Sequence, residues 1–211
     1  MKIALIGATG NIGSQIAQQA LARKHSVTAI SRRAALPAEL AGVQAVVADS
    51  LDVAALSAAI RGHEVLASAF GPSGPDTANL VPKQAAVLVA AARAAGIKRV
   101  VVVGGAGSLL VAPGLQLVDA PGFPDMYKPF AIAHREALAI FRAATDIDWT
   151  FFAPAAEIGP GDKRGGFRIG TDSLISDAAG HSKISYADYA DAFVTELETA
   201  AHPQQVLTVA Y

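Results

Sequence analysis

Residues 3–13 read IALIGATGNIG, and this stretch decides the fold class. The apolar run at its start is typical of a short strand that is buried on both faces. Apolar residues then recur at helical spacing over residues 12–21, which predicts a helix directly after the strand. Gly7, Gly10 and Gly13 stand between the two as G-x-x-G-x-x-G. In this context glycines permit a tight turn, close approach of a pyrophosphate and close packing of helix on strand. The stretch predicts nucleotide binding, and the alternative is a purely structural turn.

Short apolar runs and alanine-rich helical segments alternate along the rest of the chain. Further strands are predicted at residues 27–30, 43–48, 65–70, 99–103, 149–152 and 206–209. Helices are predicted at 53–60, around Pro82 up to Gly96, at about 129–144, and from a capping-box pattern at Ser185–Asp188 to about Glu198. This alternation indicates βαβ units and a parallel sheet. We expect a single α/β domain over residues 1–211. It would be a Rossmann-type doubly wound parallel sheet with helices on both faces and a small C-terminal elaboration at about 155–185.

Composition excludes several classes of protein. The 211 residues carry 17 Lys and Arg against 18 Asp and Glu, so a basic surface for nucleic acid is not expected. The absence of cysteine excludes disulfides, thiolate zinc sites and cysteine nucleophiles. The five histidines lack ligand spacing, and we predict no metal site. The apolar stretches are too short for a signal peptide or a membrane span. We expect a cytoplasmic protein, monomeric or homodimeric, without a membrane partner.

The ends of the predicted strands suggest which dinucleotide is bound. An acidic residue after the second strand usually selects NAD, whereas arginine accommodates the 2′-phosphate of NADP. This chain has Ser31-Arg32-Arg33 there, which favours NADP(H), with NAD(H) still possible; the alternative is a solvated surface pair. The residues expected to hold the cofactor are Gly7, Thr9, Gly10, Asn11, Ile12 and Gly13 at the pyrophosphate, Arg32 and Arg33 at the 2′-phosphate, Asp49 and Ser50 at the adenine, and Ser68, Ala69, Phe70 and Gly104 further along.

The glycine motif and the arginine pair resemble those of atypical short-chain dehydrogenases/reductases. The similar group is the NAD(P)H-binding one that includes NmrA-like proteins and flavin/biliverdin reductase B. Four further stretches point to the bacterial NADH-flavin reductase-like branch: VVGGAGSL at 102–109, YKP at 127–129, DWTFFAP at 148–154 and ISYADYA at 184–190. The resemblance extends over essentially the whole chain. It implies that backbone groups at Pro154, Ala155 and Ala156 meet the nicotinamide carboxamide.

One departure from most short-chain dehydrogenases bears on the reaction. Their Tyr-x-x-x-Lys pair moves a proton to or from a substrate oxygen, and no such pair occurs in this sequence. A flavin or quinone acceptor mainly needs a well-placed hydride, and its proton can come from water. The leading interpretation is therefore an NADPH-dependent reductase of such acceptors, with FMN or FAD as substrates. The alternative is an NmrA-like sensor that binds NADP(H) without turnover. An epimerase or dehydratase ranks last, because that class normally keeps the pair.

Four residues are candidates for the catalytic centre. Ser108 follows the fifth strand, at the edge where open α/β sheets bind ligands, although it could be an ordinary turn serine. In flavin/biliverdin reductase B the corresponding serine stands slightly earlier, at the position of Ala106. Tyr127 and Lys128 follow a Pro- and Gly-rich loop that could close over a substrate. His134 falls near a histidine of the resembled family and is otherwise an ordinary helix residue.

Two arginines of the Gly-rich insert, Arg164 and Arg168, could contact a flavin phosphate or could simply be solvated. We expect Tyr186 and Tyr189 to pack the C-terminal helix.

Overall fold

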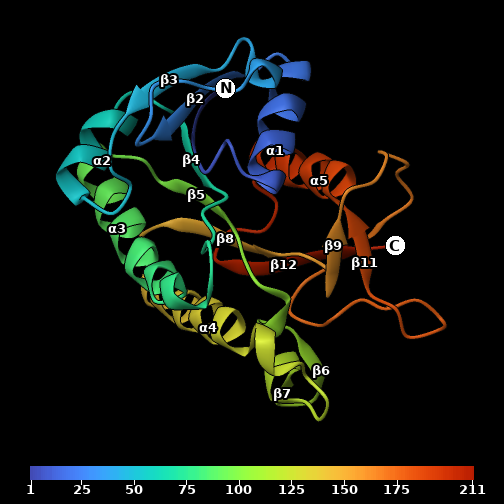
Figure 1. The fold of residues 1–211 in the computed structure, drawn as a ribbon. Helices are drawn as coiled ribbons and strands as arrows, with labels where there is room; N and C mark the ends of the chain where they lie inside the picture. The colour runs from blue at the N-terminus through green and yellow to red at the C-terminus, as the bar shows by residue number, and fades with distance from the viewer.

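A computed structural model describes residues 1–211, and an eight-stranded sheet runs through it in the order β10-β12-β8-β5-β4-β1-β2-β3 (Figure 1). The strands are β1 (Lys2–Ile6), β2 (Ser26–Ser31), β3 (Gln44–Val47), β4 (Val65–Ser68), β5 (Arg99–Val103), β8 (Asp148–Ala153), β10 (Arg168–Gly170) and β12 (Gln205–Ala210). Seven strands are parallel, and only β10 runs antiparallel, against β12. The strand order reverses between β1 and β4, which is the point where doubly wound sheets bind ligands.

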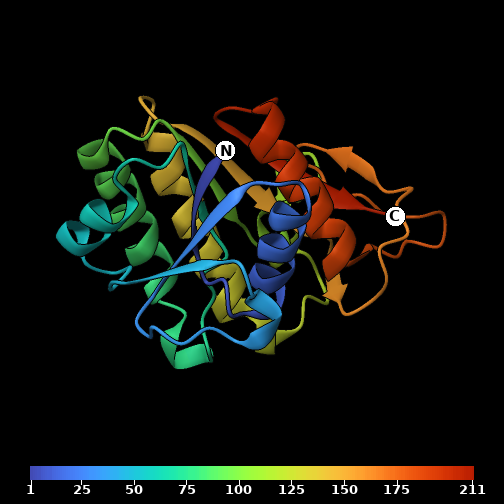
Figure 2. The same cartoon turned by 90° about the horizontal axis from the view of Figure 1, so that it is seen from above.

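Helices cover both faces of the sheet (Figure 2). One face carries α1 (Asn11–Ala22) and α5 (Tyr186–Thr199), and the other carries α2 (Val53–Ile60), α3 (Leu80–Ala95) and α4 (Lys128–Ala143). Successive residues of β1 enter different cores: Ile3 and Leu5 pack on the α1–α5 side, and Ala4 and Ile6 on the α2–α4 side. This explains why the predicted strand is apolar at every position. The Rossmann-type doubly wound α/β class is confirmed.

Local sequence signals set several helix ends as expected. Ser185 caps α5 by accepting a hydrogen bond from Asp188 N at 3.0 Å, as the capping-box pattern predicted. Asp52 caps α2 in the same way, accepting from Ala55 N at 2.7 Å. At the end of α3, Gly96 takes the left-handed conformation that a glycine adopts easily, with φ of 75°.

The structure differs from the sequence prediction chiefly in short strands. The predicted strands 43–48 and 65–70 are shorter, at Gln44–Val47 and Val65–Ser68. The segment predicted as a loop after β5 contains a hairpin of β6 (Leu110–Ala112) and β7 (Leu115–Gln116). A separate parallel ladder joins β9 (Glu157–Gly159) to β11 (Lys183–Ser185). Strands of two or three residues have no periodic signal, and their pairing is decided by partners distant in sequence. None of the helices combines the length and apolar character needed to cross a bilayer.

Candidate functional site

The carboxyl ends of β1, β4, β5 and β8 lie along one edge of the sheet, because these strands are parallel. The segments that follow them are the glycine loop after β1, Ala69 and Phe70 after β4, the Gly104–Gly107 turn after β5, and Pro154 after β8. The topology therefore brings most of the predicted site segments to the same edge.

Within the glycine loop, the three glycines have different environments. A Cβ at Gly7 would lie 2.5 Å from the main-chain oxygen of Ala69, and one at Gly13 would lie 2.0 Å from the main-chain oxygen of Gly7. Both glycines are thus required by the packing of β1, β4 and α1. At Gly10 the nearest atom, Gly7 O, would be 3.4 Å away, and the residue is exposed. Intramolecular packing does not explain Gly10.

The N-terminus of α1 fits a dinucleotide pyrophosphate. Gly10 is its N-cap residue, no side chain caps the helix, and no acidic residue occupies the first turn. The first amides of a helix need acceptors, and together with the helix dipole they favour an anion. An exposed glycine at this position leaves the backbone open to a phosphate group.

The predicted cofactor residues at the ends of β2 and β3 are largely open to solvent, whereas Ser68 at the end of β4 is buried. Arg32 and Arg33 are exposed and neither guanidinium forms an ion pair, so both remain available to a phosphate. The exposed Asp49 carboxylate accepts a hydrogen bond from Leu51 N at 2.9 Å, next to the half-buried Ser50. Ser68 is different, because its hydroxyl is buried and donates to Gln84 Oε1 at 3.3 Å while accepting from Phe70 N at 3.3 Å. Those bonds engage Ser68 within the protein.

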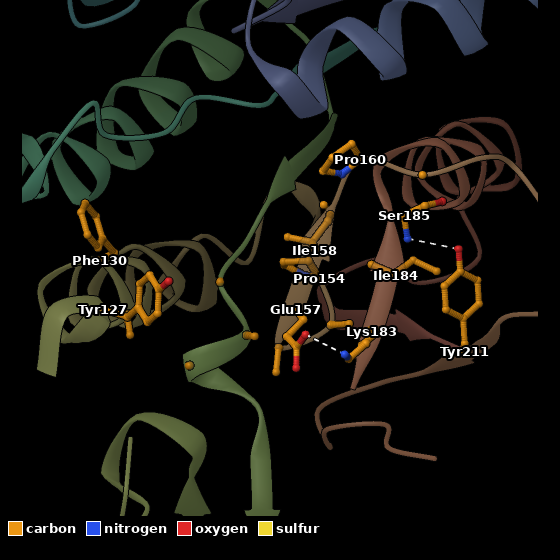
Figure 3. A pocket seen from close by; sticks show the side chains of 18 of the residues that line it. Tyr127, Phe130, Pro154, Glu157, Ile158, Pro160, Lys183, Ile184, Ser185 and Tyr211 are labelled. Carbon is orange, nitrogen blue, oxygen red and sulfur yellow. Dashed lines mark hydrogen bonds and ion pairs between the residues drawn. The ribbon is translucent and has the colours of Figure 1, made fainter. Parts of the chain in front are cut away.

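A pocket of about 970 Å³ lies between α4 and the β9–β11 ladder. Figure 3 shows Tyr127 and Phe130 on one side of it, and Pro154, Ile158 and Ile184 on the other. The turn after β5 contributes Gly105, Ala106 and Gly107 to its wall. Aromatic and aliphatic groups make up much of this lining, as in sites for small organic ligands.

The structure brings some of the predicted catalytic residues together and leaves others outside the pocket. Tyr127 and His134 line it, as do Pro154, Ala155 and Ala156. Lys128 does not; its ammonium pairs with Asp125 at 2.6 Å, and this pairing lowers the pKa of the Asp125 carboxyl.

Ser108 and Gly104 also lie outside the pocket lining. Ser108 is buried in the turn after β5, and its Oγ has no hydrogen-bond partner. Gly104 is buried against Phe151, whose ring would lie 2.3 Å from an added Cβ. Packing therefore explains this glycine without any contact to a cofactor.

His134 is a neutral polar group in the pocket wall. Burial lowers the pKa of His134 from its usual 6.5 to about 4, because the charged ring would lose the water that stabilises it. Its Nδ1 is buried without a partner, and no hydrogen bond engages the imidazole. The ring stands edge-on to Phe151 with centroids 6.3 Å apart, and Gly105 packs against it. At neutral pH His134 can hydrogen-bond a ligand but carries no charge.

Comparison with known proteins adds the family. Residues 7–200 match the model of the NAD(P)H-binding family. The chain belongs to that family. A solved structure from Burkholderia pseudomallei, named there as a proposed exported protein, is 54% identical with a TM-score of 0.93, and each chain covers 100% of the other. A proposed NADH-flavin reductase from Streptococcus pneumoniae is 32% identical with a TM-score of 0.90, over 100% of this chain and 99% of that one.

A proposed epimerase from Bacteroides thetaiotaomicron is similarly close. It is 36% identical with a TM-score of 0.89, covering 100% of this NAD(P)H-binding protein and 96% of the other. The resemblance to atypical short-chain dehydrogenases/reductases is thus confirmed as to family and fold. The neighbours' names differ in the reaction they assign.

Several pocket residues of this NAD(P)H-binding protein were missed by sequence reasoning. They come from the short ladder and from the end of β12: Glu157, Ile158, Lys183, Ile184 and Tyr211. Glu157 and Lys183 form an ion pair of 3.0 Å across the ladder (Figure 3). The stretch ISYADYA at residues 184–190 predicts the start of the last helix, and nothing in it indicates a strand partner at residue 158.

Proposed function

We propose that this protein is an NADPH-dependent reductase that transfers a hydride to a flavin, a quinone or a similar conjugated acceptor. The observation that carries the proposal is the position of the pocket. It opens at the same edge of the sheet as the glycine loop, and aromatic and aliphatic side chains line much of it. A planar, weakly polar ring system suits such walls.

The residues have separate tasks in this proposal. The backbone of Gly7–Gly13 would hold the pyrophosphate, and Arg32 and Arg33 would hold the 2′-phosphate. Bound NADPH supplies the hydride, and a proton from water completes the reduction of the acceptor. Tyr127 and Phe130 would orient the acceptor ring, and the neutral His134 would hydrogen-bond one of its polar atoms. Positioning then supplies most of the catalysis.

The Streptococcus pneumoniae neighbour is named for a flavin reductase reaction and the Bacteroides thetaiotaomicron neighbour for an epimerase reaction. The missing Tyr-x-x-x-Lys pair supports the former for this chain, because an epimerase that oxidises a sugar hydroxyl needs a proton acceptor beside it.

An anaerobic turnover assay tests the proposal. Purified protein is mixed with NADPH and, separately, with FMN, riboflavin or a naphthoquinone, and the loss of nicotinamide absorbance is followed. We expect saturable oxidation that depends on the protein. The Arg32→Ala/Arg33→Ala variant should lose at least about tenfold in affinity for NADPH and little for NADH, because charge-assisted phosphate contacts are removed.

Two results would contradict this proposal. Tight calorimetric binding of NADPH without reduction of any acceptor would reject the reductase and favour the sensor. Equal weakening of NADPH and NADH in the double variant would reject the role of Arg32 and Arg33.

A further inference from the structure

Asp188 is a buried carboxylate to which the proposed reductase chemistry gives no task. It lies in the first turn of α5 and is fully buried. Oδ1 accepts a hydrogen bond from Gly165 N at 2.9 Å, and Oδ2 accepts from Arg164 N at 3.2 Å and from Tyr211 Oη at 2.7 Å. Burial alone would raise the pKa of Asp188, but these donors outweigh it and hold the pKa below its usual range. The charged Asp188 carboxylate thus binds both the loop that contains Arg164 and the phenol of Tyr211.

The loop in question spans residues 160–166 and forms part of the pocket wall. Two further bonds fix it to the same helix. Ser185 Oγ donates to the main-chain oxygen of Asp162 at 3.2 Å, and Lys163 Nζ binds Asp191 at 2.8 Å. The loop is Gly-rich and lacks helix or strand, so these contacts determine its position.

This attachment places the guanidinium of Arg164 over the ring of Tyr211, 3.6 Å from the ring centroid. Both residues line the pocket. No carboxylate forms an ion pair with Arg164, whereas Glu157 and Lys183 neutralise one another. Among the other charged side chains of the lining, the Asp162 carboxylate also forms no ion pair. Stacking on an aromatic face leaves the N–H groups of arginine free for an anion.

We propose that Asp188 positions Arg164 as an anion-binding group, so that the pocket prefers conjugated acceptors that carry a phosphate or carboxylate. The acceptor role rests on the proposed function, but the anion preference is a property of binding alone. The ring of such an acceptor would lie against the apolar wall, with its anionic group at Arg164. Asp188 is a positioning residue and does not touch the ligand.

FMN and riboflavin make a matched pair of probes, because they share one ring system and differ by a phosphate. Their dissociation constants are measured from flavin fluorescence in the absence of NADPH. The native protein should bind FMN more tightly than riboflavin. Arg164→Gln should weaken FMN binding about tenfold, as expected for one partly exposed charge-assisted contact, and leave riboflavin within about twofold.

Three further variants make the test specific. Asp188→Asn should reduce the preference for FMN as Arg164→Gln does, whereas a merely structural loss would weaken both flavins equally. Asp162→Asn should increase FMN affinity, because it removes a repelling charge. Arg61→Gln is the matched control, since Arg61 is exposed at the end of α2, at the opposite edge of the sheet, and should change neither constant.

Equal affinity for the two flavins in the native protein, binding of neither, or an unchanged preference in Arg164→Gln would overturn the inference. The binding measurement involves no turnover. Its outcome therefore does not depend on whether the reductase assay succeeds. If circular dichroism shows that Asp188→Asn is unfolded, the Arg164→Gln variant still tests the inference, because Arg164 is exposed and its substitution leaves the fold intact.

Discussion

Gly10 and Gly13 belong to one loop, but only Gly13 is required by the folded chain itself. A Cβ at Gly13 would overlap the main-chain oxygen of Gly7 at 2.0 Å, whereas one at Gly10 meets only that oxygen at 3.4 Å. Gly10 also has an ordinary φ of −81°, so alanine fits its backbone without strain. Apart from the modest preference of a helix N-cap for glycine over alanine, the reason for glycine at this exposed position is the close approach of a ligand to the backbone.

This contrast predicts opposite behaviour of two small substitutions. Gly10→Ala should lose at most about 1 kcal/mol of stability, the cost of alanine at a helix N-cap, and at least about tenfold in NADPH affinity, because the methyl group intrudes on the pyrophosphate. Gly13→Ala should be destabilised by about 2 kcal/mol or more, because the clash is with backbone. Thermal unfolding and calorimetry measure the two effects. Full NADPH affinity in folded Gly10→Ala would mean that the loop is only a turn.

Among the elements, α4 packs its apolar residues into the core and contributes His134 to the pocket wall. The folded state lowers the pKa of His134 to about 4 by burial, while the unfolded chain keeps the ordinary 6.5. Above pH 6.5 the ring is neutral in both states, so its contribution to stability is fully present. As the pH falls from 6.5 towards 4, only the unfolded chain takes up the proton, and stability is lost.

The pH dependence of unfolding therefore separates native protein from His134→Gln. Between pH 7 and 4.5 the native protein should lose about 2 kcal/mol more than the variant, which has no titrating ring. Urea unfolding at both pH values measures the difference, and the carboxylates common to both proteins cancel. An identical loss in the two proteins would show that the imidazole protonates freely in the folded state.

Elements whose ends are marked by residues next to them in sequence could be predicted, whereas elements that depend on distant strand partners could not. The helix Val53–Ile60 and the strand Arg99–Val103 were predicted with the bounds that the structure has, because caps and glycines mark their ends. The ladder of β9 and β11 was missed because Ile158 and Ile184, its central partners, are far apart in sequence. Tyr211 was missed for the same reason, since only the folded sheet brings it to Arg164.

At the scale of the whole molecule, a buried ion network joins α5 to the amino-terminal edge of the sheet. Arg99, at the start of β5, pairs with Glu196 at 2.5 Å, and their side chains are only 11% and 3% exposed. Thr150 and His202 also donate to the Glu196 carboxylate. This edge lies opposite the pocket, so the network serves the assembly of the fold and not ligand binding.

Glu196→Gln should therefore destabilise the whole domain by about 3 kcal/mol, because it leaves the buried Arg99 charge without its counter-ion. The Arg93–Asp146 pair supplies the control, since both of its side chains are 48% exposed and solvent screens their attraction. Asp146→Asn should hardly move the melting temperature. NADPH affinity should be unchanged in Glu196→Gln below its melting temperature, because the network is remote from the glycine loop. Similar melting temperatures for the two variants would show that water reaches Glu196 and that the Arg99–Glu196 pair does not stabilise the packing of α5 on the sheet.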